Sequence, residues 1–272
     1  MPSYAITGAA RGIGLALTAQ LSEDASNEVF AVVRTPAAAD ELRALANTRR
    51  NLHILSANIT SPQQLRDVTS AISDATGGSL DVLFENAAWV ADGTAALTAS
   101  AAAEEENLSR IRAAFVDAID HNVIAMMSVT NTFLPLIRRG AGRRIIVLTT
   151  ALADVNLTLA VGMTYHIPHS ASKAAMNVVL AKMAIELQKQ EIVLVGISPG
   201  WVSRGEQVTD QEKARLEYQR QLFRNIRPDL ERQLSPAESA SMVLKVAENV
   251  TLHQAGRMLS HTGTDEWLSK FG

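Results

Sequence analysis

Short apolar runs that alternate with longer amphipathic segments constrain the fold of this chain more than any other feature. The runs are apolar at both alternating positions, which is typical of strands buried on both faces of a parallel sheet. The expected strands are 3–7, 28–33, 52–57, 80–85, 144–149, 192–198 and, with a weaker pattern, 257–260. The expected helices are 12–23, 37–47, 61–75, 104–138, 169–189 and 235–249. This order predicts an α/β Rossmann fold, a doubly wound parallel sheet of about seven strands with helices on both faces.

Length and composition agree with one large globular domain, which we expect to span residues 1–272. A net charge of −3 gives no reason to expect nucleic acid or an anionic membrane surface as a partner. The chain has no cysteine, which excludes disulfides and thiolate metal sites, and we expect no metal. No segment is apolar enough to span a bilayer and the N-terminus has no signal-peptide pattern, so we expect a cytoplasmic protein.

Two stretches interrupt the alternation of strands and helices. Residues 88–103 are rich in alanine and threonine, and residues 201–232 are highly charged. Loops that leave the carboxyl ends of strands surround the ligand in doubly wound folds, and both stretches fit that place. Within the second, 208–226 has the pattern of an amphipathic helix, which could act as a lid or simply present a solvated charged face.

A glycine-rich loop follows the first expected strand and opens the first expected helix. The stretch TGAARGIG (7–14) has glycines where a tight turn and a close approach to a pyrophosphate would need them. The helix start would then present N–H groups and positive potential to the phosphates. The predicted dinucleotide contacts are Gly8, Arg11, Gly12, Ile13 and Gly14. The alternative is a purely structural glycine turn.

The residue about twenty positions after such a loop reads the adenine ribose. Here it is Arg34, directly after the second expected strand. An acidic residue would accept hydrogen bonds from a free 2′-hydroxyl, whereas an arginine pairs with a 2′-phosphate. Arg11 could assist. The sequence therefore favours NADP(H) over NAD(H), unless both arginines are ordinary surface charges.

Several motifs, in this order, make the chain resemble the short-chain dehydrogenase/reductase family. TGAARGIG matches the family's TGxxxGxG, and ENAA (85–88) stands where the family has NNAG. Asn122 matches the catalytic asparagine, HSASK (169–173) matches YxxSK, and SPGWV (198–202) matches the PG motif. The resemblance covers nearly the whole chain and implies a nicotinamide cofactor.

The resemblance also implies roles for single residues. A tyrosine of the family moves a proton, a lysine one turn later lowers the pKa of that tyrosine and holds the nicotinamide ribose, a serine orients the carbonyl, and an asparagine holds a relay water. Lys173 and Asn122 are retained, Thr150 best matches the serine, with Thr149 one residue away, and His169 replaces the tyrosine. The remaining cofactor contacts implied are Asn58, Asn86, Pro199, Gly200 and Val202.

Other positions depart from the family pattern. Asn58 replaces an aspartate that contacts adenine, although its amide oxygen could accept the same bond. Glu85 and Ala88 replace the first asparagine and the glycine of NNAG, and Arg204 replaces a threonine. Residues are also inserted before His169, which predicts an enlarged substrate loop over 151–168. The residues expected to bind the cofactor phosphates thus match the family pattern better than the residues expected to carry out the reaction.

The proton donor has several candidates. His169 could act as an imidazolium acid, since histidine works near neutral pH. Tyr165 could fold back from the enlarged loop, although a half-buried packing role is the plainer interpretation. An iminium acceptor would need no acid, and a non-redox cyclase or isomerase would keep NADP(H) only as a scaffold. Asn122 lies inside an expected helix, where asparagine is unfavourable, which suggests a local bulge that holds water.

Apolar residues near the expected site indicate the substrate. Trp89, Val90, Leu157, Met163 and Trp201 can reach one cleft in this fold and suggest a bulky apolar small molecule, although each alone could be packing. The helices 104–138 and 169–189 carry wide apolar stripes that pair between subunits in the family, which implies a homodimer or homotetramer. The expected function is an NADPH-dependent reductase of a ketone or an imine, such as an intermediate of secondary metabolism.

Overall fold

The computed structural model describes residues 1–90, 98–203 and 210–265. Seven parallel strands form one sheet in the order β3-β2-β1-β4-β5-β6-β7. The strands are β1 (Ser3–Thr7), β2 (Glu28–Val33), β3 (Leu52–Ser56), β4 (Val82–Glu85), β5 (Arg144–Leu148), β6 (Val193–Ser198) and β7 (Met258–Ser260). The order reverses between β1 and β4, which creates a crevice at the carboxyl ends of these two strands. The predicted Rossmann fold is therefore confirmed.

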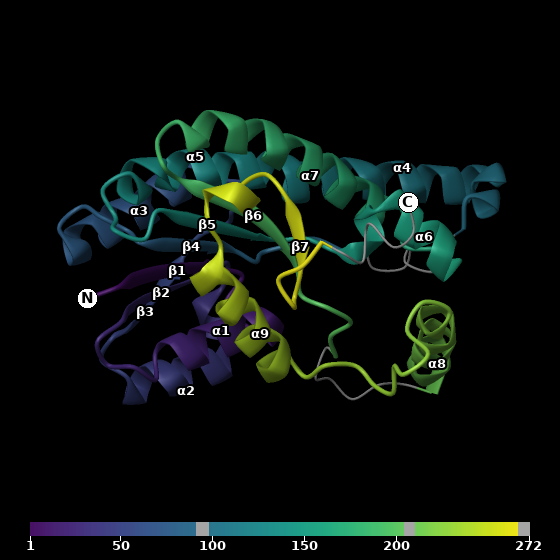
Figure 1. The fold of residues 1–272 in the computed structure, drawn as a ribbon, viewed down its shortest axis with the longest axis horizontal. Helices are drawn as coiled ribbons and strands as arrows, with labels where there is room; N and C mark the ends of the chain where they lie inside the picture. The colour runs from purple at the N-terminus through teal and green to yellow at the C-terminus, as the bar shows by residue number, and fades with distance from the viewer. Residues whose placement is uncertain (91–97, 204–209, 266–272) are drawn as a thin grey trace.

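Helices cover both faces of the sheet (Figure 1). One layer contains α3 (Pro62–Thr76), α4 (Glu105–Ile119), α5 (Ala125–Ile137) and α7 (Ile167–Gln188). The opposite layer contains α1 (Gly12–Leu21), α2 (Asp40–Thr48) and α9 (Pro236–Asn249). The two hydrophobic cores lie between these layers and the sheet, which explains why the strand runs are apolar at every position. Short 3₁₀ turns occupy Pro36–Ala38, Ser100–Ala103, Ala151–Ala153 and Leu252–Gln254.

Two regions differ from the helices expected from periodicity. The expected helix 104–138 is divided by a π-helical turn at Asp120–Ile124, which separates α4 from α5. The expected loop 151–168 is wrong in part, because it contains the short helix α6 (Val155–Val161) and the first residues of α7. The side chain of Asp154 caps α6 by accepting a hydrogen bond from Leu157 N at 2.7 Å. Gly162, with φ of 76°, ends the helix.

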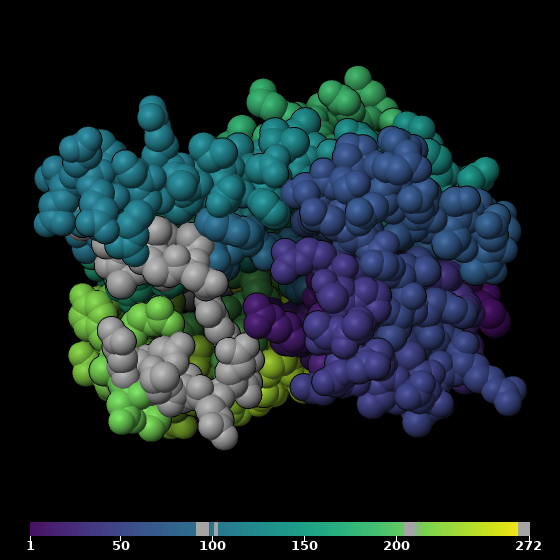
Figure 2. Space-filling model, turned by 180° about the vertical axis from the view of Figure 1, so that it is seen from behind, coloured from purple at the N-terminus to yellow at the C-terminus, as the bar shows by residue number. Residues whose placement is uncertain are grey.

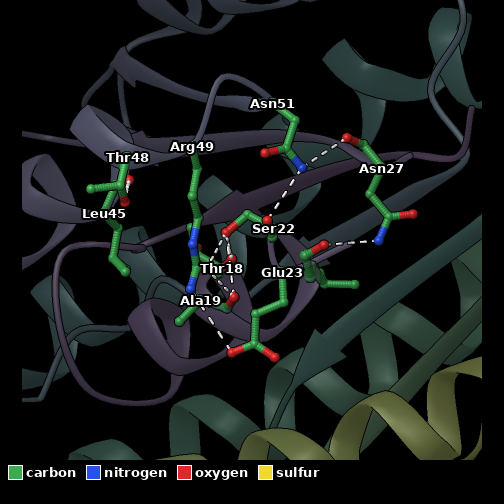
Figure 3. Close-up of polar contacts among 10 residues, drawn as sticks. Thr18, Ala19, Ser22, Glu23, Asn27, Leu45, Thr48, Arg49 and Asn51 are labelled. Atoms are coloured by element: carbon green, nitrogen blue, oxygen red, sulfur yellow. Dashed lines mark hydrogen bonds and ion pairs between the residues drawn. The ribbon is translucent and has the colours of Figure 1, made fainter. Parts of the chain in front are cut away.

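The C-terminal end of α1 is held by side chains from the loop that precedes β3 (Figure 3). Arg49 donates to Ala19 O and to Ser22 Oγ, the latter at 2.7 Å. Asn51 Nδ2 donates to three backbone oxygens, including Asn27 O at 3.1 Å. These bonds satisfy carbonyl groups that a helix end leaves without intrahelical partners. These bonds hold the C-terminal end of α1, while the N-terminus of this helix faces the carboxyl edge of the sheet.

Asp81 ties the amino ends of three strands together. Its carboxylate accepts from Ser3 N at 2.8 Å, Ser3 Oγ at 2.9 Å, Ala141 N at 2.6 Å and Gly142 N at 3.0 Å. Burial alone would raise the pKa of Asp81, but these hydrogen bonds outweigh it and hold that pKa below its ordinary value. The side chain thus joins β1 to the segments before β4 and β5.

Within the described parts of the chain, no helix is both long enough and apolar enough to cross a membrane. Among the same described residues, no three histidine, aspartate or glutamate side chains lie close enough together to bind a metal ion.

Candidate active site

The glycine loop has the shape that a pyrophosphate site needs. Gly8 and Gly12 have positive φ, 70° and 58°, which a residue with a side chain would adopt only with strain. A Cβ on Gly14 would lie 2.3 Å from Gly8 O, so the loop closes onto α1 only because position 14 is glycine. A Cβ on Gly12 would meet no described atom within 4 Å, so open space lies above the start of α1. The first turn of α1 contains no acidic residue, which leaves its positive end available to an anion.

Asn86 fastens this loop across the crevice between β1 and β4. Its Nδ2 donates to Thr7 O and to Gly8 O, each at 3.0 Å. In return, Thr7 Oγ1 accepts from the backbone N of Asn86 at 3.1 Å and of Ala87 at 3.2 Å. Asn86, predicted as a cofactor contact, therefore also fixes the shape of the phosphate loop.

The residues predicted to contact the adenine and its ribose lie at the carboxyl ends of neighbouring strands. Arg11 precedes α1, and Arg34 follows β2 directly; both are exposed. Asn58 follows β3, and its Oδ1 accepts a hydrogen bond from Thr60 N at 3.2 Å. Because an amide oxygen has two lone pairs, Asn58 retains one for a further donor. The structure thus brings these three residues to one edge of the sheet.

Lys173 and Asn122 meet at the same edge, on the face covered by α5 and α7. Lys173 is 2% exposed, and its Nζ donates to Leu148 O at 2.8 Å. Asn122 belongs to the π-helical turn, so the bulge expected there is confirmed. Its Nδ2 donates to Ser172 Oγ at 3.0 Å and to Trp89 O at 3.0 Å, and its Oδ1 accepts from Trp89 N at 2.8 Å. The asparagine therefore clamps the segment after β4 to the start of α7.

A buried carboxyl group, Glu85, shares a small cavity with Lys173. The cavity has a volume of about 10 Å³, room for about one water molecule, and Thr7, His121 and Asn122 also line it. Thr130 Oγ1 donates a hydrogen bond to Glu85 Oε1. Burial raises the pKa of Glu85 to about 8, against the opposing effects of Thr130 and Lys173. Burial likewise lowers the pKa of Lys173 to about 8, against the attraction of Glu85.

His169 and Tyr165, the two side chains considered as acids, occupy different surroundings. His169 is half-buried in the first turn of α7, one turn before Lys173, and its backbone O accepts from Ser172 Oγ at 2.9 Å. Tyr165 precedes α7 and packs in a separate apolar cluster, with its ring 6.2 Å from that of Tyr218. Burial raises the pKa of the Tyr165 phenol, which makes it a weaker acid than a free tyrosine.

Thr149 and Thr150, the two candidates for the hydroxyl that orients the carbonyl group, differ in their contacts. Thr149 is buried, and its Oγ1 donates to Asn177 Oδ1 at 2.7 Å, which commits it to the core. Thr150 is half-buried just beyond β5, where its Oγ1 accepts from Leu152 N at 3.3 Å. The contacts therefore leave Thr150, and not Thr149, at the edge of the site.

The segment after β6 is held in place by distant residues. Pro199 O accepts from Ser239 Oγ of α9 at 2.8 Å, and Val202 forms an isolated bridge with Leu234. Gly200 has φ of 89°, and a Cβ there would lie 2.9 Å from the side chain of Leu234. Arg204 lies outside the described residues.

The helix α8 (Asp210–Arg224) confirms the helix expected at 208–226 and lies beyond the carboxyl ends of the strands (Figure 1). It packs on α6 through an apolar cluster, which we call the lid cluster. Its members are Ala151, Leu152, Leu157, Val161, Met163, Tyr165, Leu222, Phe223 and Ile226. Leu157 and Met163, expected to face substrate, are thus buried in packing. Figure 2 shows the blue-green helical layer above and the yellow-green last third of the chain below on this face of the molecule.

Polar residues join α8 to the start of α7. Trp201 Nε1 donates to Gln219 Oε1 at 3.3 Å, and Gln219 Nε2 lies 3.4 Å from His166 Nε2. The ring of Trp201 lies 5.5 Å from that of Phe223. Gln219 is buried although it belongs to a helix that reads as charged and solvated. Sequence reasoning assigned no role to Gln219, Ser172 or Thr130, because each acts through partners far away along the chain.

The chain was compared with known proteins. The family described as short chain dehydrogenase matches residues 3–215. The short-chain dehydrogenase/reductase atnB of Arthrinium sp is 38% identical over 271 residues, which cover 98% of this chain and 100% of that protein. The short chain dehydrogenase virK of Hypocrea virens is 34% identical over 279 residues, with coverage of 98% and 100%.

Solved structures show the same fold. The NADPH-bound carbonyl reductase from chicken fatty liver has a TM-score of 0.75 at 24% identity, covering 97% of this chain and 98% of that one. The carbonyl reductase Sniffer of D. melanogaster has a TM-score of 0.74 at 22% identity, with the same coverage. Together with the motifs and the geometry above, these matches show that the chain belongs to the short-chain dehydrogenase/reductase family and is an oxidoreductase of that family.

Proposed function

We propose that the protein is an NADPH-dependent reductase that transfers hydride to the ketone or imine carbon of a bulky apolar metabolite. The observation that carries this proposal is the joint placement of two groups of residues at one edge of the sheet. The glycine loop after β1 is open and closely held by Asn86. Lys173 and Asn122 lie beside it on the face covered by α7.

The residues present fit a dinucleotide. The free space above Gly12 and the start of α1 suit the pyrophosphate, Arg34 suits a 2′-phosphate, and Lys173 suits the nicotinamide ribose. Bound NADPH would supply the hydride. The residues of this chain would hold the pyrophosphate at the glycine loop, hold the nicotinamide ribose through Lys173, and place the substrate beside His169.

His169 is the proton donor that the geometry supports better than Tyr165. The imidazole lies on the turn of α7 that leads into Lys173, whereas Tyr165 packs with the lid cluster and has a raised pKa. An imidazolium N–H of His169 would protonate the oxygen that develops negative charge during ketone reduction. An iminium substrate would need no such proton.

The substrate is proposed to be bulky and apolar because two tryptophans follow strands at the carboxyl edge of the sheet. Trp89 follows β4 and lies with its ring 6.2 Å from that of His121. Trp201 follows β6 and lies under α8, against Phe223. Both indoles are half-buried, and such surfaces suit a large ring system better than a small polar substrate.

The test is the loss of NADPH absorbance with a panel of bulky ketones and cyclic imines. Substrate-dependent loss of NADPH, with a stoichiometric reduced product, supports the proposal. Product formed without loss of NADPH would instead identify a cyclase or an isomerase that keeps the cofactor as a scaffold. If neither occurs although NADPH binds, the chain is a cofactor-binding protein without turnover.

Replacing Arg34 with alanine should weaken NADPH binding by about 10- to 100-fold and leave NADH binding nearly unchanged. A charge-assisted hydrogen bond to a 2′-phosphate accounts for an effect of this size, and NADH has no such phosphate. Titration calorimetry with both cofactors measures the two dissociation constants. Arg43→Ala, which removes an exposed arginine of α2, is the matched control. Equal losses for NADPH and NADH in Arg34→Ala would contradict the assignment.

We also propose that the protein is a homodimer or a homotetramer that assembles through α4 and α7. These helices pack side by side, and each leaves large apolar side chains exposed, such as Val116 at 64%, Val178 at 59% and Ile185 at 63%. Val178→Glu together with Ile185→Glu should dissociate the assembly, because the burial of charge opposes association. Sedimentation velocity of wild type and variant measures this, and a monomeric wild type would refute it.

A further inference from the structure

The position of Glu85 follows from the register of the sheet. Glu85 is the last residue of β4, and it pairs with Thr7 of β1 on one side and with Val147 of β5 on the other. Successive side chains of a strand point to opposite faces, so Glu85 lies on the same face as Leu83, under α5 and α7. The carboxyl group at this position is 5% exposed, at the carboxyl end of β4.

The surroundings of Glu85 contain few other charges. Among the described residues that line the cavity, the titratable ones are Glu85, Lys173 from α7 and His121 from the π-helical turn. His121 Nδ1 lies 2.9 Å from Asp117 O and 3.8 Å from Asp120 Oδ2, so this nitrogen is engaged by residues of its own helical segment. Thr130 of α5 contributes a hydroxyl that donates to the carboxyl oxygen. Lys173 is therefore the cation that a charged Glu85 faces.

The hydrogen bonds of both groups are compatible with their charged forms, since an ammonium group donates and a carboxylate accepts. Lys173 Nζ acts as a donor to Leu148 O, and Glu85 Oε1 acts as an acceptor from Thr130 Oγ1. A buried ammonium group without a counter-ion loses its proton readily, because low polarity disfavours the charge. In this chain His169 replaces the family's tyrosine one turn before Lys173, and Glu85 adds a carboxyl group to the cavity that Lys173 lines. Both changes alter the charges around the same lysine.

We propose that Glu85 is a positioning residue that acts through Lys173, as the counter-ion that keeps this lysine protonated in the active site. This inference rests on the proposed function for its catalytic meaning, since a protonated Lys173 is needed to hold the ribose. At low pH both groups carry their protons. Once Glu85 is a carboxylate, its charge favours the proton on Lys173, which Lys173 therefore keeps to higher pH than it would beside a neutral side chain.

The experiment follows the proton on Lys173 directly. The chain contains only six lysines, so the side-chain signals of protein labelled with ¹³C-lysine can be resolved by NMR. The signal of Lys173 is assigned with Lys173→Met and is followed between pH 5.5 and about 10, the range that surrounds its shifted pKa. Wild type is compared with Glu85→Gln, which removes the charge and keeps the shape. Glu186→Gln removes an exposed carboxylate from α7 and is the matched control.

Lys173 should titrate about one pH unit lower, or more, in Glu85→Gln than in wild type, and Glu186→Gln should show no shift. If Glu85→Gln does not fold, Glu85→Asn restores the residue that the family pattern has there and should give the same direction. An unchanged Lys173 titration in the folded variant overturns the proposal. A shift toward higher pH overturns it as well.

The NMR titration needs no substrate, so it separates this inference from the proposed function. A protein that reduces nothing in the panel could still show the shift. If the protein is a working reductase but Lys173 titrates at the same pH in wild type and in Glu85→Gln, only the counter-ion proposal is overturned. In a working reductase, an iminium substrate needs no proton from His169, so with this substrate the alkaline limb of the kcat profile should move down by the same amount in Glu85→Gln. A purely structural defect would lower kcat at every pH.

Discussion

Replacing His169 with phenylalanine should lower kcat for a bulky ketone by about 10²- to 10⁴-fold, the usual contribution of a positioned acid. The variant keeps an aromatic ring at this position, but no N–H remains to protonate the developing alkoxide. The dissociation constant of NADPH should stay within about twofold, because the phosphate loop and Lys173 are unchanged. Steady-state kinetics and cofactor titration of the same preparation measure both quantities.

A matched pair of substrates sharpens this prediction. The reduction of a preformed iminium ion of similar shape needs no proton, so His169→Phe should reduce it at a near-normal rate. His253→Phe, at an exposed histidine far from the site, is the control for the general effect of the change. Near-normal reduction of the ketone by His169→Phe would remove this imidazole as the acid. An equal loss with both substrates would assign His169 to substrate placement.

Asp81→Ala should lower the free energy of unfolding by about 2–4 kcal/mol at pH 7. The change leaves the amides of Ser3, Ala141 and Gly142 without their carboxylate, and bonds to charged groups contribute about 1.5–3 kcal/mol each before water replaces part of them. Asp81 is only half-buried, which limits the sum. Urea denaturation followed by circular dichroism measures the difference.

The pH dependence of this difference is a second check. The folded pKa of Asp81 lies below its unfolded value, so its contribution is present above about pH 4 and is lost as the pH falls through the folded pKa. Wild type and Asp81→Ala should therefore converge in stability in acid. Asp74→Ala, at an exposed position of α3, should change the stability by less than about 0.5 kcal/mol. A constant difference between wild type and Asp81→Ala down to pH 2 would contradict the assignment.

The strands could be read from the sequence because both faces of the sheet are covered. In β2 every residue from Val29 to Val33 is buried, so the pattern needs no partner to be recognised. The phosphate loop was equally readable, since Gly8, Gly12 and Gly14 are required by local backbone geometry. Asn122 was identified by its resemblance to the family's asparagine and was supported by its unfavourable position inside an expected helix, for which the π-helical turn gives the reason.

Features that depend on distant partners could not be read in the same way. The helix α6 has only seven residues, of which valine and threonine are poor helix formers, and it is stabilised by packing against α8. Glu85 was noted only as a departure from a motif. Its partners Thr130 and Lys173 lie 45 and 88 positions further along the chain, and the shared cavity exists only once α5 and α7 cover the sheet. Tyr165 and Gln219 meet through the same long-range packing.

The lid cluster has a consequence for how this protein could change its substrate during evolution. Its apolar members come from 151–165 and 222–226, two segments that pack mainly on each other, whereas the phosphate loop and Lys173 are anchored in the sheet. A substitution in one segment alone would leave a void or a clash in the other. Exchange of both segments together would change the lid cluster and leave the phosphate loop and Lys173 unaltered. The two segments would therefore have to change together, although about 60 residues separate them.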